Sequence, residues 1–392
     1  MQAVRLILVL ALAPAVGVGL CRFAYSLLLP DMRESLQWSY ATAGFMNTAN
    51  AAGYLTGALA ASPIAWRIGL HRAVVFATAV CVVTLVLSMS ANTVVLSIAR
   101  LLSGFAGAVA FVAASALAAN IAQAYPGRLG FLMGLLYTGP AIGIFISGLT
   151  APFLLEALGP GSWWIVWGVL AAIAVVLTAV LPLARAAPDQ GSGGRTAASA
   201  AILPMLIYMA GYFLYGMGSI AYMTFMIAFV RDAGGGALLQ SAFWTLIALG
   251  AFISPSLWGG VIGRSRGGGG TAIVTAVTGF GALVPFFASS PAALAISAAV
   301  FGAAFFAVTS STTAFVRFNY PPQAWPKAIG VLTMAFGVGS MLGPILTGAV
   351  SDASGNLGAM PAIAAVLLAV GAAIAACQKP LENEGRPVSP AT

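Results

Sequence analysis

The sequence has few charged side chains. Lys, Arg, Asp and Glu together make up 6% of the 392 residues, against about 25% in a typical soluble domain. Hydrophobic residues make up 61%, and the mean hydropathy is +1.01. A soluble fold of this size needs a polar surface that this composition cannot supply. The composition therefore excludes soluble enzymes and predicts a protein that crosses a membrane many times.

Histidine and cysteine are scarce as well. His71 is the only histidine, which leaves no residues for a histidine-based metal site or a Ser-His-Asp triad. The three cysteines, Cys21, Cys81 and Cys377, lie in separate apolar runs and do not form the even, regularly spaced set of a disulfide framework. No G-x-x-x-x-G-K-S/T segment is present. We therefore expect no ATP-binding loop, no metal and no cofactor.

Long apolar runs are abundant. A bilayer core requires roughly 20 apolar residues per helix, and twelve runs are long enough. They cover residues 4–30, 38–64, 73–91, 94–122, 129–155, 162–183, 201–230, 239–262, 271–289, 292–317, 327–351 and 358–378. The first run could instead be a signal peptide, because Arg5 precedes it and Val18-Gly19-Leu20-Cys21 faintly resembles a lipoprotein cleavage site. Its length and the leucine before the cysteine favour an uncleaved first helix.

One polar segment divides the chain. Residues 184–200 contain proline, aspartate and a run of glycine and serine, a composition typical of a flexible linker. Six apolar runs precede this segment and six follow it. We therefore predict an N-terminal six-helix bundle at 1–183, a cytoplasmic linker at 184–200, a C-terminal six-helix bundle at 201–378 and a cytoplasmic tail at 379–392.

The basic residues predict the orientation of the helices. With the N-terminus in the cytoplasm, twelve of the 16 Lys and Arg side chains fall on the cytoplasmic side and only Arg33 and Arg231 fall outside. The twelve are Arg5, Arg67, Arg72, Arg128, Arg185, Arg195, Arg264, Arg266, Arg317, Lys327, Lys379 and Arg386. Both termini are therefore expected in the cytoplasm. The net charge of +8 reflects this pattern, and no basic patch indicates a nucleic-acid partner.

The two halves share a pattern of glycine and proline. A shift of 200 positions places Gly139 on Gly339 and Gly143 on Gly343. Further matches at the same offset are Pro126 with Pro326, Gly130 with Gly330 and Gly148 with Gly348. Two parallel repeats about an axis along the membrane normal describe a major facilitator-type transporter. We predict an all-α integral membrane protein with 12 transmembrane helices in two pseudo-symmetric six-helix bundles.

Several motifs resemble those of the major facilitator superfamily (MFS) over the whole chain. Arg100-Leu101-Leu102-Ser103-Gly104 resembles the R-x-x-x-G motif of the fourth helix, and Gly139-Pro140-Ala141-Ile142-Gly143 resembles the Gly-Pro motif of the fifth. Arg22-Phe23-Ala24-Tyr25 and Gly53-Tyr54-Leu55-Thr56-Gly57 are similar to segments of the bacterial YbfB/YjiJ-like branch. The resemblance implies that helices 1, 4, 7 and 10 line a central cavity.

The loop after the second helix resembles the MFS motif G-x-x-x-D-R-x-G-R-R. Ala65 or Trp66 stands at its acidic position, and Gly263 stands there in the second half. The Asp-to-Arg latch of the family therefore lacks its carboxylate. The resemblance implies a gating role for Arg67, Gly69, Arg72, Gly139, Pro140, Gly143, Gly339, Gly343 and Pro344. The Gly-Pro motif is linked to export in similar drug antiporters, but a close helix crossing or a bend explains these residues equally well.

Two arginines lie within helices that the resemblance assigns to the cavity. A charged side chain near the middle of a membrane costs roughly 2.5 to 3.5 kcal/mol, so it persists where it meets water, a partner or a substrate. None of the eight acidic residues lies at the centre of a run, so Arg22 and Arg100 lack an obvious carboxylate partner. Either could bind an anionic substrate through its guanidinium fork. Alternatively, each could snorkel outward or bond helix carbonyls as a structural tie.

Other candidates for substrate contact are aromatic or amide side chains. Tyr212, Tyr215 and Tyr222 share one face of the seventh helix with Tyr208 and could form an aromatic wall. Tyr25 follows Arg22 by three residues. Asn47 and Asn50 in the second helix are either ligands or, more commonly, interhelical hydrogen bonds. Proton coupling usually requires a carboxylate in the pathway, and the candidates at the outer rim are Asp31, Glu34 and Glu156.

These observations favour a secondary transporter that moves a small organic solute, anionic or zwitterionic, across a bacterial inner membrane by alternating access. An alternative of the same fold is a drug or metabolite efflux antiporter. An intramembrane transferase enzyme is a third possibility, but the rim acids do not cluster as such chemistry requires. The expected partners are the small-molecule substrate and the lipid bilayer, and we expect the protein to function as a monomer.

Overall fold

The computed structural model describes residues 2–125, 128–186 and 201–381, and all regular structure in these ranges is helical. The first span consists of α1 (Gln2–Pro14), a π-helix η1 (Ala15–Phe23) and α2 (Tyr25–Ser35). The other N-terminal helices are α3 (Tyr40–Ile68), α4 (Leu70–Leu87), α5 (Thr93–Gln123), α6 (Leu129–Tyr137), α7 (Gly139–Leu158) and α8 (Trp163–Val180). The C-terminal helices are α9 (Leu206–Asp232), α10 (Ala237–Arg264), α11 (Gly269–Phe287), α12 (Pro291–Asn319), α13 (Trp325–Ser354) and α14 (Met360–Ala376).

Each of the twelve predicted runs corresponds to one helical span. The fifth is divided into α6 and α7, and the first contains the π-helix. Ten of the described spans are long and apolar enough to cross a membrane; of the other two, α14 is a shorter apolar helix of 17 residues and α3 has 29 residues. The prediction of an all-α membrane protein with twelve transmembrane helices is confirmed. The predicted linker and tail lie mostly outside the described residues, in 187–200 and 382–392.

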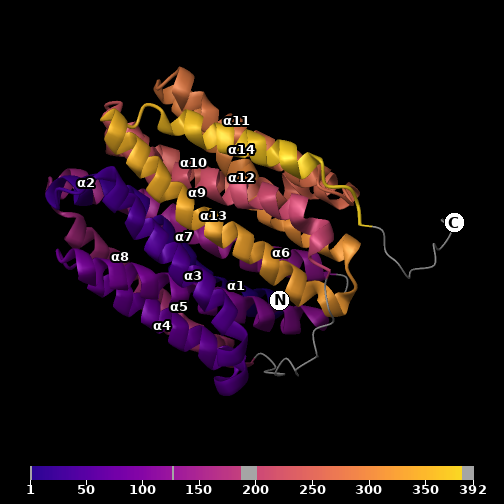
Figure 1. Cartoon of the computed structure of the whole chain (residues 1–392). Coiled ribbons are helices and arrows are strands. Elements are labelled where there is room, and N and C mark those ends of the chain that lie inside the picture. Colours follow the sequence, from indigo (N-terminus) through magenta and orange to yellow (C-terminus); the bar gives the residue numbers. More distant parts are fainter. Residues whose placement is uncertain (1, 126–127, 187–200, 382–392) are drawn as a thin grey trace.

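The helices form two groups in space. Figure 1 shows the N-terminal helices, indigo to magenta, mostly below the C-terminal helices, pink to yellow. The groups meet where α3 packs against α13, α7 against α10, and α2 against α9. Residues far apart in the sequence therefore face each other along the interface between the two bundles.

The repeated glycines lie at equivalent helix crossings. Gly143 in α7 packs on the first span, and a Cβ added there would lie 2.6 Å from the Cα of Gly19. Gly343 in α13 packs on α9, and its Cβ would lie 2.9 Å from the Cα of Met217. Real Cβ atoms do not approach so closely. The shared pattern therefore encodes the same backbone contact in both bundles, as small residues at helix crossings do.

The Gly-Pro motif interrupts only one of the two helices that carry it. The break between α6 and α7 falls at Thr138, directly before Gly139 and Pro140. In the second bundle α13 continues through Pro344 without a break. A proline removes one helical hydrogen bond, and neighbouring helices can compensate for it inside a bundle.

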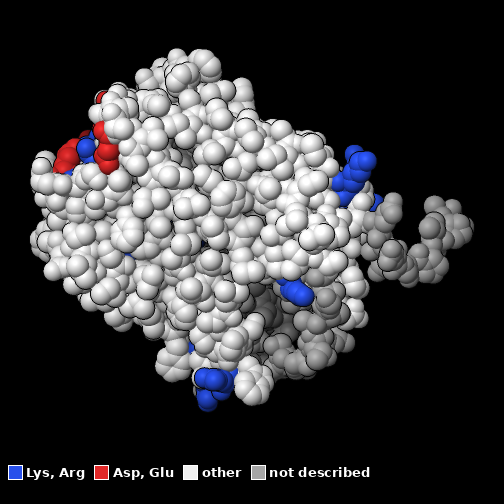
Figure 2. Space-filling view, in the orientation of Figure 1, with Lys and Arg blue, Asp and Glu red and all other residues white. Residues whose placement is uncertain are grey.

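The charged side chains gather at two ends of the molecule. Figure 2 shows the acidic side chains together at the upper left, whereas further basic side chains lie at the lower and right edges. We call the first the acidic end; it includes Glu34, Asp232 and Asp352. The opposite end, where α1 begins and α14 ends, is called the basic end (Figure 1).

Candidate functional site

Arg100 in α5 is fully engaged by the protein. It is 2% exposed, and its Nε donates to the carbonyl of Met46 at 3.4 Å. One terminal nitrogen donates to the carbonyl of Cys21, and the other donates to the carbonyl of Arg22 at 3.4 Å and to Oδ1 of Asn47 at 3.1 Å. Its guanidinium carbon also lies 4.6 Å from the centre of the Tyr25 ring. This geometry favours the alternative in which Arg100 ties helices together.

The π-helix explains why the carbonyls of Cys21 and Arg22 are free to accept hydrogen bonds from Arg100. Wide π turns occur as local bulges within α-helices, and the hydrogen-bond pattern changes where they end. The end of η1 lies at Phe23, and the carbonyls of Cys21 and Arg22 there accept from Arg100. Gly17 and Gly19 within η1 allow the backbones of α5 and α7 to approach closely. The bulge thus shapes the middle of the first span.

Arg22 is buried but has a different environment. It is 5% exposed, and its guanidinium carbon lies 4.9 Å from the centre of the Tyr54 ring and 5.9 Å from that of Phe23. Among the described residues, no hydrogen bond or ion pair satisfies its guanidinium. Its nitrogens are also not among the fully buried polar atoms without a partner, so they border open space. Arg22 therefore has free hydrogen-bond donors.

Aromatic side chains of the first span and of α3 flank Arg22. Tyr54 in α3 lies against Arg22, and Tyr212 in α9 and Tyr137 in α6 lie nearby. Phe23 contacts Phe306 of α12 edge to face, with ring centres 6.3 Å apart. The cluster therefore joins both bundles at the level of Arg22.

More aromatic rings extend this cluster. Tyr212 stacks on Phe336 of α13 at 5.3 Å, and Tyr137 contacts Phe111 of α5 edge to face at 5.7 Å. Tyr54, Phe111, Phe306 and Phe336 are half-buried, and Tyr137 is 52% exposed. We call these five the aromatic cluster. Tyr212, one of the tyrosines predicted to form an aromatic wall, lies beside this cluster.

The remaining predicted tyrosines have hydroxyl groups bound within the protein. The hydroxyl of Tyr25 donates to the carbonyl of Ala43 at 2.8 Å, that of Tyr215 donates to the carbonyl of Phe305 at 2.5 Å, and that of Tyr222 bonds Ser297 at 2.5 Å. All three side chains are at most 1% exposed. These tyrosines position helices and supply no free donor.

The two asparagines make contacts of the kind expected for interhelical hydrogen bonds. Asn47 accepts from Arg100 and donates to Thr224 of α9 at 2.5 Å, so it links the two bundles. Asn50 donates to the carbonyl of Arg100 at 3.1 Å and to Ser103 at 2.9 Å. The Oδ1 atom of Asn50 is buried without a partner.

The acidic end holds the two bundles together. Asp352 of α13 accepts the backbone N–H groups of Tyr40 at 2.7 Å and Ala41 at 2.9 Å, at the start of α3. Glu34 forms an ion pair with Arg231 at 2.6 Å. On the basic side of the aromatic cluster, no hydrogen bond or ion pair between described residues joins the bundles. The contacts therefore close the acidic end.

The three predicted proton-coupling acids occupy this end. Asp31 is 4% exposed and accepts the N–H groups of Gly161 at 2.8 Å and Trp163 at 3.0 Å, which caps the start of α8. Glu34 belongs to the ion pair described above. Glu156 is exposed and lies beside Gly236, where α10 begins. Each carboxylate is thus placed at a helix end or a bundle contact, away from Arg22.

The predicted loop residues lie at the basic end. Gly69 has φ of +88° and joins α3 to α4, which explains the glycine there. Arg67 and Arg72 are exposed beside it, and no described acid pairs with them. This agrees with the missing acidic position of the motif.

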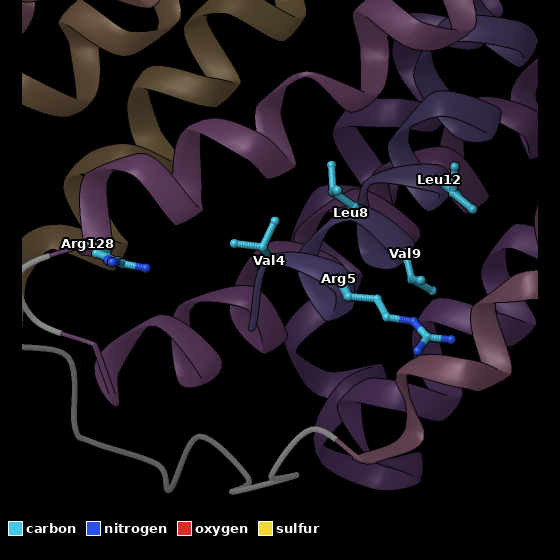
Figure 3. Close-up of a pocket in the computed structure, with 6 residues that line it drawn as sticks. All are labelled: Val4, Arg5, Leu8, Val9, Leu12 and Arg128. Atoms are coloured by element: carbon cyan, nitrogen blue, oxygen red, sulfur yellow. The ribbon is translucent and has the colours of Figure 1, made fainter. Parts of the chain in front are cut away.

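A pocket of about 590 Å³ lies along α1 near the basic end. Its lining residues are Val4, Arg5, Leu8, Val9, Leu12 and Arg128. In Figure 3 the side chain of Arg5 points away from Arg128, so the two arginines do not converge on one ligand. The pocket does not include Arg22 and is mainly apolar, which makes it a weaker candidate for the substrate site.

Sequence reasoning missed Tyr54, Tyr137 and the role of Asp352. Tyr54 lies one helical turn from Asn50 and within the quoted Gly53–Gly57 segment, so helical periodicity could have included it. Tyr137 directly precedes the break at Thr138. No signal in the sequence places Asp352 against a helix that begins 312 residues earlier.

Comparisons with known proteins agree with this architecture. The model of the family described as "Uncharacterised MFS-type transporter YbfB" matches residues 14–376. No curated protein matches the chain in a sequence search.

Solved structures share the fold. Two structures of the nucleoside transporter NupG, one of them a mutant, have TM-scores of 0.70 and 0.71 at 16% and 15% identity, and they cover 96% and 94% of this chain and 98% of theirs. A bacterial homolog of the human lysosomal transporter Spinster, in an inward-facing and unoccupied conformation, has a TM-score of 0.66 at 15% identity, with 95% of this chain and 94% of that chain covered.

Proposed function

Since this chain belongs to the YbfB-type family of MFS transporters, we propose that it carries a small organic anion across the membrane by alternating access, with Arg22 as the anion-binding group. The family and fold are those of a membrane transporter rather than of an enzyme. The proposal adds the substrate charge and the residue that recognises it.

The observation that carries this proposal is the free guanidinium of Arg22. A charged group in the middle of a membrane protein is costly unless a partner or a ligand compensates for it. Arg100, at a similar depth, has four acceptors from the protein, whereas Arg22 has none among the described residues. An anionic substrate would supply the missing acceptors through charge-assisted hydrogen bonds.

The contacts between the bundles support an alternating-access cycle. The bonds of Asp352 and Glu34 close the acidic end, while Tyr137, Thr309 and Ser310 are exposed on the basic side. We infer that Arg22 is reached from the basic end in this conformation, because the bonds between the bundles lie at the acidic end. In the opposite conformation the acidic-end contacts would break and the basic ends would approach, as two repeats rock about a central site.

The charge distribution supports an orientation. Basic residues dominate one end and acidic residues the other (Figure 2), and membrane proteins keep the basic side in the cytoplasm. We assign the basic end and both termini to the cytoplasm of a bacterial inner membrane, with bundles at 1–183 and 201–378. The site is built by a single chain, so a monomer is sufficient for transport.

Solute uptake tests the proposal. The purified chain is reconstituted in proteoliposomes, and counterflow is measured with labelled organic anions and with neutral amides of the same carbon skeleton. We expect counterflow for at least one anion and its loss in Arg22→Gln. The matched control is Arg264→Gln, because Arg264 is exposed at the basic end. Counterflow of neutral solutes only, or full anion transport by Arg22→Gln, would overturn the proposal.

A further inference from the structure

We propose that the anion is a small aromatic monocarboxylate of the benzoate type, which Arg22 binds through its carboxylate and the aromatic cluster binds through its ring. This inference rests on the proposed function and names the substrate class for the same site. Three features of the structure carry it: the number of free cations, the surroundings of Arg22, and the exposure of the aromatic rings.

The number of free cations favours a single negative charge. Only Arg22 and Arg100 lie in the interior of the described helical spans, and the nitrogens of Arg100 already donate to protein acceptors. A phosphate dianion or a dicarboxylate would leave one charge unpaired in a region of low dielectric, which is costly. One guanidinium fork matches one carboxylate, with two parallel N–H···O bonds.

The surroundings of Arg22 favour a planar ligand. The guanidinium lies 4.9 Å from the centre of the Tyr54 ring, within the range of a cation–π contact. A carboxylate bonded to the edge of the guanidinium would place an attached ring among the neighbouring aromatic side chains. Phe306 reaches this region from α12, because its ring contacts Phe23, the residue next to Arg22.

The exposure of the aromatic cluster favours an aromatic partner. Phe301 and Phe305 are at most 4% exposed and stack on each other with ring centres 5.3 Å apart, so they belong to the protein core. Tyr54, which contacts the buried Arg22, and Phe306, which contacts Phe23 next to it, retain exposed surface. Aromatic rings gain energy from stacked or edge-to-face contacts beyond the area that they bury. A saturated ring would gain the burial but not the ring contacts.

Competition binding to the wild-type chain tests the inference without any variant. Labelled benzoate is bound to the purified protein in detergent and displaced by benzoate, by cyclohexanecarboxylate or by benzamide. Cyclohexanecarboxylate keeps the charge and nearly the size, whereas benzamide keeps the ring and lacks the charge. We expect cyclohexanecarboxylate to bind about fivefold more weakly than benzoate, because ring contacts of about 1 kcal/mol are lost. Benzamide should not compete measurably.

Two leucine variants separate the cluster from general packing. Phe306→Leu removes a ring beside Phe23 and should reduce the preference for benzoate over cyclohexanecarboxylate several-fold. Phe280→Leu removes a ring of α11 that is 61% exposed, away from Arg22, and should leave the preference unchanged. The preference is a ratio measured on folded protein, so a partial loss of stability does not alter it.

The outcomes distinguish this inference from the proposed function. Equal binding of benzoate and cyclohexanecarboxylate, with both abolished in Arg22→Gln, would overturn the aromatic inference and leave anion transport intact. Binding of aliphatic anions but not of benzoate would do the same. If no organic anion binds in an Arg22-dependent way to protein that remains monodisperse with an unchanged melting temperature, the proposed function fails together with the inference.

Discussion

Asp352 and Tyr40 lie 312 residues apart in the sequence, and the carboxylate of Asp352 accepts the backbone N–H of Tyr40 at 2.7 Å. The second carboxylate oxygen accepts the N–H of Ala41 at 2.9 Å. An acid from one bundle therefore caps the first turn of a helix in the other, where the helix dipole also favours a negative charge. Among the described residues, no acid makes a matching contact at the basic end, and Gly263 and Ala65 or Trp66 occupy the motif positions. The contacts of Asp352 therefore favour the conformation that is closed at the acidic end.

The variant Asp352→Asn should shift this balance toward opening of the acidic end. A lost helix cap costs about 1 kcal/mol, which corresponds to about fivefold in the population ratio. Spin labels at Gln37→Cys and Ala233→Cys, in a Cys377→Ser background, would report a longer distance component. The control is Asp31→Asn, which removes a cap within one bundle and should lower stability without lengthening the distance. An unchanged distance distribution in Asp352→Asn would exclude its role as a latch.

The variant Arg100→Gln should destabilise the fold strongly. The carbonyls of Met46, Cys21 and Arg22 would lose a donor in a region without water, and removing one partner of a buried charged network costs about 3 kcal/mol. Thermal unfolding in detergent measures the loss, with the exposed Arg264→Gln as the control. A melting temperature like that of the wild type would contradict the role of Arg100 in holding the helices together.

The variants Gly143→Ala and Gly343→Ala should both be poorly tolerated. The added methyl groups would meet the backbones of Gly19 and Met217, and overpacking of this kind costs about 1–3 kcal/mol. The control is Gly134→Ala, because nothing lies within 4 Å of a Cβ at that position in the interrupted fifth span. Equal melting temperatures for the three variants would show that the crossings are not tight.

The ion pair of Glu34 and Arg231 should contribute little. The side chains are 52% and 33% exposed, respectively, and exposed pairs contribute about 0.2–1 kcal/mol. A double-mutant cycle with Glu34→Gln and Arg231→Gln should therefore give a small coupling energy that decreases further in high salt. A coupling energy several times larger would make this pair, rather than Asp352, the main bond at the acidic end.

Cys377 offers a test of the orientation. It is exposed at the end of α14, whereas Cys21 and Cys81 are buried. A membrane-impermeant maleimide should leave intact cells unlabelled and should label Cys377 in inside-out vesicles. The Cys377→Ser variant controls for labelling of the two buried thiols. Labelling from the outside of intact cells would reverse the assigned orientation.

Much of the fold was predictable from the sequence because hydrophobic length alone sets a transmembrane span. The repeated glycines, such as Gly139 and Gly339, also predicted equivalent helix crossings in the two bundles, because only small residues fit where helix backbones touch. The π-helix was not predictable, since its turns depend on close contacts with α5 and α7 rather than on local preference.

The site was predictable only in part. An arginine within an apolar run indicates a buried charge, so Arg22 and Arg100 both stood out as candidates. The sequence could not tell them apart, because the difference is which carbonyls the folded chain brings within reach. Tyr54 and Asp352 depend on contacts between distant helices, and these contacts have no local signature.

The π-helical segment makes the first span sensitive to length rather than to residue type. Each residue of an α-helix advances the chain by about 100° around its axis. Insertion of one more residue into this stretch, where the wide turns already hold extra chain, would rotate everything beyond it by about that angle. The side chains of Arg22 and Asp31 would then both point away from their present partners, Tyr54 and the N–H of Gly161. Natural insertions should therefore be excluded from this short stretch, even where substitutions are tolerated.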